Sequence, residues 1–282
     1  METQKGYNIK TMKVTLLNNE QVDLSETLDN MVGDEYYYKY LNLDRVLSYS
    51  TMKWLLKSPK WFAHMKKKGM TETQALRDGK LVHTEILEPE KYGQFTFVDT
   101  SSKNTTKWKL AKEQNGAETT YTLKEKYMAS RIAAAFLQND SCVSFMKGAE
   151  TETPALVEVD GLAVRGKADI FKEGEYVADV KTTNDGLKDI TLKNGSSVNQ
   201  FKFTIEKYDY DLQAYLYTQL YNVPDFYWLV IDKTTTDIGI FKASEQTLQS
   251  GKDKLEAAIA IYKAFFVDEL IDLSQYHKEG TL

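Results

Sequence analysis

Two short stretches of the chain combine acidic and basic side chains at a spacing that suits metal binding. They are residues 166–170, with the sequence GKADI, and residues 178–182, with the sequence ADVKT. Because side chains alternate between the two faces of a strand, Asp179 and Lys181 share one face, one pleat apart. A mere surface ion pair would contribute under about 1 kcal/mol. Charges beside an apolar neighbour such as Val180 are costly without a partner or a task, so the pattern favours a functional site.

Whether Asp169 joins this site depends on the loop that follows its strand. A two-residue turn at positions 173–174 would pair Asp169 with Ala178 and point it away from Asp179. A three-residue loop over 173–175 would place Asp169 opposite Asp179 on the same face, and the glycine at position 174 permits a left-handed backbone. Two opposed carboxylates repel each other unless a cation lies between them, so this second register implies a divalent ion.

The cysteine and histidine content limits the metal chemistry. Cys142 is the only cysteine, which excludes an intrachain disulfide, a thiolate zinc cluster and a four-cysteine iron–sulfur site. The only histidines are His64, His83 and His277, and they stand in unrelated local contexts. We therefore expect any metal to lie among carboxylates, which favours Mg²⁺ or Mn²⁺.

Composition places the chain among ordinary soluble globular proteins. Of its 282 residues, 42% are hydrophobic and 27% are charged. No run of about 18 apolar residues occurs and the first residues lack a hydrophobic core, so we expect no membrane span, no signal peptide and a cytoplasmic location. The net charge of −5 argues against a protein coated in positive charge, although it leaves room for a local basic groove.

One segment, residues 45–71, concentrates positive charge. It holds no acid, and aromatic side chains are interleaved with its basic ones. The basic residues are Arg45, Lys53, Lys57, Lys60, Lys66, Lys67 and Lys68, and the aromatic residues are Tyr49, Trp54, Trp61 and Phe62. Such a mixture suits a nucleic-acid backbone. The alternative is a solvated amphipathic helix whose aromatic side chains lie in the core.

The elements expected around these residues indicate a single mixed α/β (α+β) domain over residues 45–282, preceded by an irregular, acidic N-terminal arm over residues 1–44. Ser50, Ser58 (with Pro59 next to it) and the pair Thr71 and Gln74 are predicted to start helices. The predicted helices cover residues 50–57, 59 onward, 71–88, 123–138, 205–221 and 248–270. The predicted strands cover residues 95–98, three runs within 155–183, 226–231 and 238–241. A loop or a short helix is expected over 99–120, and a loop over 184–203.

In their order and spacing these motifs resemble the catalytic core of the PD-(D/E)XK nuclease superfamily, and more narrowly its RecB-like branch and phage RecE-type exonucleases. Asp169, followed ten residues later by Asp179-x-Lys181, is similar to the core motif. The stretch 79–83 resembles the helical Gly-x-x-x-His motif, and 213–217 resembles the Gln-x-x-x-Tyr motif. Residues 47–50, followed by Ser58-Pro59, are similar to the opening helix of RecE-like domains. The resemblance covers residues 45–270 and implies a restriction-endonuclease-like core, a central mixed β-sheet flanked by helices.

The sequence departs from the family pattern at three points. Ala168 stands where the family's name has proline, a substitution common in this branch, and the second acid is Asp179 in place of glutamate. The single cysteine excludes the iron–sulfur subgroup.

The resemblance also implies roles for individual residues. Asp169, Asp179 and the Val180 carbonyl would hold Mg²⁺, with Mn²⁺ able to substitute. His83 would be a further ligand or would orient one, the alternative being a histidine satisfied in the core. Lys181 would position and help deprotonate the attacking water, or would stabilise charge in the transition state.

Further residues have two interpretations each. Glu152 is a candidate for an added acid near the metal, or a glutamate at a strand edge. Gln213 and Tyr217 lie one helical turn apart and would support the motif strand or touch DNA, or would make a polar-aromatic contact in the core. Arg165 and Lys167 would contact phosphate, or would form exposed ion pairs. In the basic segment, Ser50 and Lys53 are candidates for DNA contact.

With this resemblance, the features predict a Mg²⁺-dependent exonuclease that resects linear double-stranded DNA in the 5′ to 3′ direction, for phage-type recombination by single-strand annealing. The resemblance implies a homo-oligomeric ring lined by the basic segment, an annealing-protein partner, and a phage or prophage origin within a bacterial host. The alternatives are an endonuclease or structure-specific nuclease on the same core, and a catalytically silent DNA-binding module. The intact Asp169, Asp179 and Lys181 count against the last of these.

Overall fold

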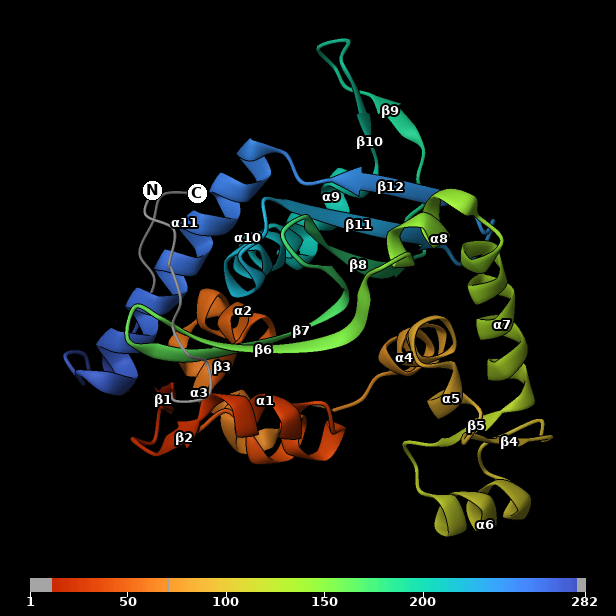
Figure 1. Cartoon of the computed structure of the whole chain (residues 1–282), viewed down its shortest axis with the longest axis horizontal. Helices are drawn as coiled ribbons and strands as arrows, with labels where there is room; N and C mark the ends of the chain where they lie inside the picture. Colours follow the sequence, from red (N-terminus) through yellow and green to blue (C-terminus); the bar gives the residue numbers. More distant parts are fainter. Residues whose placement is uncertain (1–11, 70, 278–282) are drawn as a thin grey trace.

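The computed structural model describes residues 12–69 and 71–277. Its centre is a mixed sheet of six strands in the order β12-β11-β8-β7-β3, with β6 paired along the remaining edge of β7 (Figure 1). Its strands are β3 (Leu47–Ser48), β6 (Glu150–Val159), β7 (Leu162–Lys172), β8 (Tyr176–Thr183), β11 (Asp225–Asp232) and β12 (Ile238–Lys242). Among the described residues, three two-stranded pairs accompany it: β1 (Lys13–Thr15) with β2 (Gln21–Asp23), β4 (Thr96–Val98) with β5 (Thr120–Thr122), and β9 (Asp189–Thr191) with β10 (Ser197–Asn199).

Helices cover both faces of the central sheet. The helices are α1 (Leu24–Met31), α2 (Tyr49–Lys57), α3 (Pro59–Lys68), α4 (Gln74–Leu87), α5 (Pro89–Tyr92), α6 (Thr106–Asn115), α7 (Leu123–Leu137), α8 (Asp140–Met146), α9 (Phe201–Tyr208), α10 (Tyr210–Tyr221) and α11 (Glu245–Tyr262). Shorter helical turns are η2 (Tyr36–Tyr40), η3 (Lys263–Val267) and η4 (Leu273–Gln275). Within the described ranges, no helix has the length and apolar character that a bilayer crossing requires.

The two faces of the sheet bury separate apolar cores. Val177 on β8 packs in the core that includes side chains of α2, α10 and α11, whereas Ala178 and Val180 pack in the core that includes α4 and α7. A central strand of this kind is apolar on both faces, as expected for one covered by helices on each side. The predicted fold class, a central mixed sheet flanked by helices, is therefore confirmed.

The N-terminal region departs from the expectation of an irregular appended arm. Residues 12–44 form β1, β2, α1 and η2, and these elements bury Val14, Met31 and Leu41 against Leu156 of β6 and Ala163 of β7. The apolar side chains of this region are spread along the sequence, but the fold brings them together against β6 and β7. Residues 1–11 of the predicted arm lie outside the described residues.

Two predicted helix starts shift by two residues because another side chain makes the capping hydrogen bond. The helix predicted from Ser50 begins at Tyr49, since Ser48 is the cap and its amide donates to the Thr51 hydroxyl at 2.8 Å. The helix predicted from a Thr71 capping box begins at Gln74, because the Thr73 hydroxyl accepts from the Leu76 amide. Ser58 caps α3 with Pro59 in its first turn, as predicted.

Three longer predictions also need correction. The single helix expected over 205–221 is two helices, because Asp209 has a left-handed backbone, with a φ of 55°, between α9 and α10. The helix expected over 248–270 starts at Glu245 and ends at Tyr262, where η3 continues it. The loop expected over 184–203 contains the β9–β10 hairpin, which projects from the body in Figure 1. Over 99–120, where a loop or a short helix was expected, the structure has the helix α6.

Replacing Glu125 by glutamine should destabilise the fold by about 2 kcal/mol at neutral pH. Burial alone would raise the pKa of Glu125, but hydrogen bonds from Lys103, Thr122 and Gln74 outweigh it and lower the pKa to about 2. A carboxylate with a depressed pKa stabilises the folded state above its unfolded pKa, and this contribution is lost as the pH falls through its folded pKa. Urea unfolding should therefore show a difference between the variant and the wild type at pH 7 that shrinks toward pH 2. An equal difference at both pH values would contradict this assignment.

Candidate metal centre

The site lies where strands β7 and β8 separate. They pair only from Ile170 with Ala178 to Lys172 with Tyr176, which leaves the three-residue loop over 173–175. Gly174 in this loop has a φ of 71°, the left-handed backbone that the loop needs. This register, which the sequence left open against a two-residue turn, places Asp169 level with Asp179.

Past the last β7–β8 pair, the Asp169 side chain makes a hydrogen bond to β8 in place of the β7 backbone. Its Oδ2 accepts a hydrogen bond from the Val180 amide at 2.7 Å. Ala168 packs in the core beneath α10, while Ile170, two residues on, packs in the core on the opposite face. The regular alternation of β7 therefore breaks at Asp169, which lets its carboxylate enter the opening between the strands.

Three side chains from separate elements meet here. The nearest ligand atoms of His83 on α4, Glu152 on β6 and Asp169 on β7 all lie within 4.8 Å of one another. His83 Nδ1 lies 3.3 Å from Asp169 Oδ2, and its ring is hydrogen-bonded to the Val180 backbone. The structure thus brings together His83, Glu152 and Asp169, with Val180 beside them.

The two carboxylates of this cluster repel each other, and burial disfavours the charged form of each. Burial, reinforced by the nearby Asp169 and Glu88 carboxylates, raises the pKa of Glu152 to about 7. Burial and the charge of Asp179 raise the pKa of Asp169 well above its usual range. Burial lowers the pKa of His83, which favours a neutral imidazole. Two carboxylates and one neutral imidazole suit a hard cation such as Mg²⁺ or Mn²⁺, which would also relieve the repulsion.

Asp179 lies beside this cluster and is held by two other partners. It is only 2% exposed, its Oδ1 accepts from Gln213 Nε2 at 2.6 Å, and its Oδ2 forms an ion pair with Lys181. Burial lowers the pKa of Lys181, but the Asp179 carboxylate, Tyr210 and Asp169 outweigh it and raise the pKa to about 12. A ligand role for Asp179 therefore stays a prediction, and an ion at Oδ2 would share that oxygen with Lys181 or displace it.

Helix α10 supports both strands from below. Gln213 holds Asp179, and the Tyr217 hydroxyl donates to the Lys167 carbonyl at 3.2 Å. Both side chains are buried, at 4% and 8% exposure. Of their two predicted roles, support of the motif strands fits this geometry, whereas direct DNA contact does not.

Gly166 allows α10 to approach β7 closely, and Gly166→Ala should disturb this support. A Cβ at this position would lie 2.5 Å from Leu220 Cδ1 and 3.1 Å from Tyr217 Cε1. Overpacking of this kind costs about 1–3 kcal/mol. Thermal or urea unfolding should show this loss, whereas Gly79→Ala, where a Cβ meets nothing within 4 Å, should not. Equal stability of the two variants would contradict the close contact.

The structure corrects the expectation that Arg165 and Lys167 face DNA. Both are buried beneath the N-terminal region. The Arg165 guanidinium stacks on the Tyr37 ring and donates to its carbonyl, and Lys167 Nζ lies 3.3 Å from Asp34 Oδ1 and 3.8 Å from Glu152 Oε2. Phosphate contact does not fit this burial, and neither does an exposed ion pair.

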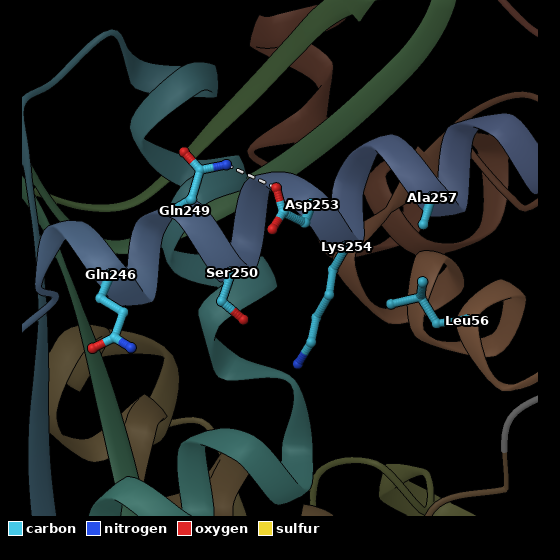
Figure 2. Close-up of a pocket in the computed structure, with 7 residues that line it drawn as sticks. All are labelled: Leu56, Gln246, Gln249, Ser250, Asp253, Lys254 and Ala257. Atoms are coloured by element: carbon cyan, nitrogen blue, oxygen red, sulfur yellow. Dashed lines mark hydrogen bonds between the residues drawn. The ribbon is translucent and has the colours of Figure 1, made fainter.

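Helix α11 fixes the start of α10. Lys254 Nζ lies 2.7 Å from Asp209 Oδ1 and 2.8 Å from Asp211 Oδ1, and the Ser250 hydroxyl donates to Asp211. Figure 2 shows Ser250 and Lys254 projecting from the same side of α11. They line an open depression of about 540 Å³ together with Leu56, Gln246, Gln249, Asp253 and Ala257. None of the clustered acids lines this depression, and its polar residues Ser250 and Lys254 contact the start of the helix that carries Gln213.

The basic segment contributes fewer free charges than its composition indicates. Arg45 pairs with Glu20, Lys66 pairs with Asp44, and Lys60 donates to the carbonyls of Ser274 and Tyr276.

Within that segment, Lys53 is close enough to Lys181 for the two charges to influence each other. Burial lowers the pKa of Lys53, opposed by Asp209 and reinforced by Lys181. Its Nζ lies 5.0 Å from the Tyr49 ring centre, and Ser50, next to Tyr49, is exposed. Contact of Ser50 and Lys53 with DNA stays a prediction.

Sequence reasoning missed Tyr221, whose hydroxyl bridges β6 and β7. Tyr221 lies eight residues after Gln213 and four after Tyr217, so all three lie on one face of α10. This spacing was the available signal.

These features define the class of PD-(D/E)XK-like nuclease domains. They are a mixed sheet with helices on both faces, an acid cluster, and an Asp-x-Lys pair where β7 and β8 separate. A family model matches residues 48–269, and the chain belongs to that family, described as a PDDEXK-like domain of unknown function (DUF3799). No curated protein shows a significant sequence match.

Comparison with solved structures supports the same fold. A protein from Eubacterium rectale, described as a "Putative exonuclease", is 16% identical, with a TM-score of 0.54 over 89% of this chain and 95% of that one. SSO0001 is 15% identical over 53% of this chain and 81% of that one, and its TM-score of 0.25 carries no weight. Family and fold together support a nuclease.

Proposed function

We propose that this protein is a Mg²⁺-dependent deoxyribonuclease that acts as an exonuclease on linear double-stranded DNA. The observation that carries the proposal is the meeting of His83, Glu152 and Asp169 within 4.8 Å, beside the Asp179–Lys181 pair. We propose an exonuclease among nucleases because a protein of the same fold carries the description "Putative exonuclease".

The chain's own residues supply distinct parts of the proposed hydrolysis. Asp169, Glu152 and His83 would hold the divalent cation. When bound, that cation would supply a water of lowered pKa and neutralise charge on the phosphate. Lys181 remains protonated with a pKa of about 12, so it favours stabilisation of developing negative charge over removal of a proton from water. Asp179 and Gln213 keep that ammonium in place.

A basic rim on α2 is the proposed path of the DNA backbone. Lys53 lies near Lys181, and Lys57 Nζ lies 3.3 Å from the centre of the Trp61 ring. Lys53→Ala should weaken DNA binding and reduce the slope of log affinity against log salt by about 1. Lys66→Ala is the matched control because Lys66 already pairs with Asp44. Fluorescence anisotropy with a labelled duplex from 50 to 300 mM NaCl measures both, and identical slopes would exclude Lys53 from the path.

The resemblance to phage RecE-type exonucleases supports a role in recombination. We propose 5′ to 3′ resection that feeds a single-strand annealing protein, a ring of identical subunits around the duplex, and a phage or prophage origin within a bacterial cell. A ring requires only its inner surface to be basic, which is compatible with the net charge of −5. Light scattering of the purified chain would give the number of subunits.

The proposed activity is tested with linear duplex labelled at either end and with a closed circle, in Mg²⁺, in Mn²⁺ and in chelator. Early release of the 5′ label, with the circle intact and no cutting in chelator, would support the proposal. Cutting of the circle would show an endonuclease instead. DNA binding without cutting in either metal would leave a catalytically silent binding module.

A further inference from the structure

The ladder between β6 and β7 is interrupted beside the candidate metal centre. Thr151 pairs with Ile170 and Thr153 pairs with Ala168, so the facing residues Glu152 and Asp169 do not pair. Glu152 has a φ of 51°, a left-handed conformation that costs a non-glycine residue about 1–3 kcal/mol. Such a conformation persists only where surrounding contacts hold it.

A tyrosine hydroxyl from α10 stands between the two strands at this point. The Tyr221 hydroxyl accepts a hydrogen bond from the Ala168 amide at 2.8 Å and donates one to the Thr153 carbonyl at 2.6 Å. A hydroxyl can accept and donate at once, so it replaces the direct bond that these two backbone groups would form in a regular ladder. The strands are thereby held apart one residue away from both Glu152 and Asp169.

A second contact anchors Thr151, the residue before Glu152, to a helix on the other face of the sheet. The Thr151 hydroxyl donates to the Leu87 carbonyl at the end of α4, at 3.2 Å. Because α4 also carries His83, the neighbours of Glu152 are tied to the helices on both faces of the sheet.

We propose that Tyr221 is a positioning residue of the metal centre, because its hydroxyl holds β6 and β7 in the spacing that turns Glu152 and Asp169 into one cluster. This inference rests on the proposed function, since it treats that cluster as the metal site. The Tyr221 ring packs 5.0 Å from the Phe171 ring and 5.9 Å from the Tyr217 ring. Tyr221→Phe therefore keeps the packing and removes only the bridge.

The experiment compares the full chain with Tyr221→Phe and with Tyr176→Phe as a matched control. The Tyr176 hydroxyl also donates to a backbone carbonyl, that of Phe145 at 2.9 Å, at the opposite end of β8. Calorimetric titration with Mn²⁺ alone measures metal affinity, and hydrogen exchange measures protection of the Ala168 amide. We expect Tyr221→Phe to bind Mn²⁺ about tenfold more weakly and to expose that amide, while Tyr176→Phe changes neither.

A double variant tests whether Tyr221 acts through Glu152. If it does, Tyr221→Phe added to Glu152→Gln should cause less further loss of Mn²⁺ affinity than it causes alone. Wild-type Mn²⁺ affinity in Tyr221→Phe, or full additivity with Glu152→Gln, would overturn the inference.

The two proposals fail in distinguishable ways. A wild type that binds Mn²⁺ and cuts no DNA, with weaker Mn²⁺ binding in Tyr221→Phe, would refute the nuclease and support the positioning role. A wild type that cuts DNA, with unchanged Mn²⁺ binding in Tyr221→Phe, would refute only the positioning role. A wild type that neither binds metal nor cuts would refute both.

Discussion

Replacing Asp169 by asparagine is expected to abolish DNA cleavage, with a loss of at least about 10³-fold in rate, and to remove most of the affinity for Mg²⁺ and Mn²⁺. Asp169 is the member of the cluster that contacts both His83 and the Val180 amide, and it faces Glu152 across the ladder. Asparagine has nearly the same shape but lacks the charge that attracts the cation. Calorimetric titration and a cleavage assay measure the two losses.

The stability of the metal-free variant separates this loss from unfolding. Burial and the charge of Asp179 raise the pKa of Asp169 in the folded state, so its ionisation lowers stability as the pH rises through that pKa. Asparagine mimics the protonated side chain. We therefore expect Asp169→Asn without metal to melt at the same temperature as the wild type or higher at pH 8. Wild-type Mn²⁺ affinity in this variant would exclude Asp169 as a ligand.

Replacing Lys181 by alanine is expected to lower the cleavage rate by about 10²–10³-fold while Mn²⁺ affinity is kept or increases. Lys181 provides the fixed positive charge beside the cluster, and removing it takes away stabilisation of charge on the reacting phosphate. The same change frees the Asp179 oxygen that Lys181 now occupies, which makes that oxygen available to a cation. The cleavage rate should thus fall while the Mn²⁺ affinity stays the same or rises.

A control for folding is necessary because Lys181→Ala leaves the buried Asp179 carboxylate without its ion pair, which can cost about 3–5 kcal/mol. Adding Asp179→Asn to Lys181→Ala removes that unpaired charge and should restore the melting temperature. Because Asp179 is itself a predicted metal ligand, only a recovery of cleavage in this double variant bears on the role of Lys181. Recovery of cleavage in the double variant would show that Lys181 acts only through stability.

Much of the fold follows from local patterns in the sequence. The apolar strand over 176–183 and the helix ending before Pro89 were both predictable because period and capping residues act over a few positions. The core that residues 12–44 form with β6 and β7 was not, because it depends on contacts between segments more than a hundred residues apart. The same long-range packing buries Arg165 and Lys167, which the sequence alone placed near DNA.

The candidate site was predictable in its residue types and only partly in its geometry. The sequence identified Asp169, Asp179 and Lys181. The register of Asp169 stayed open, because both a two-residue turn and a three-residue loop could contain the glycine at position 174, and the structure has the three-residue loop. For Glu152 the sequence left two interpretations open, an acid near the metal and a glutamate at a strand edge. It could not decide between them, because the left-handed φ of Glu152 leaves no local sequence pattern. The Tyr221 bridge arises only where α10 crosses the sheet.

The scattered origin of the site has a consequence during synthesis on the ribosome. His83 comes from α4, Glu152 and Asp169 from the sheet, and the supporting tyrosine from the end of α10. At roughly 5–20 residues per second, a ribosome needs roughly 7–28 s to pass from residue 83 to residue 221. The growing chain therefore cannot assemble the candidate metal centre until most of it has emerged from the ribosome.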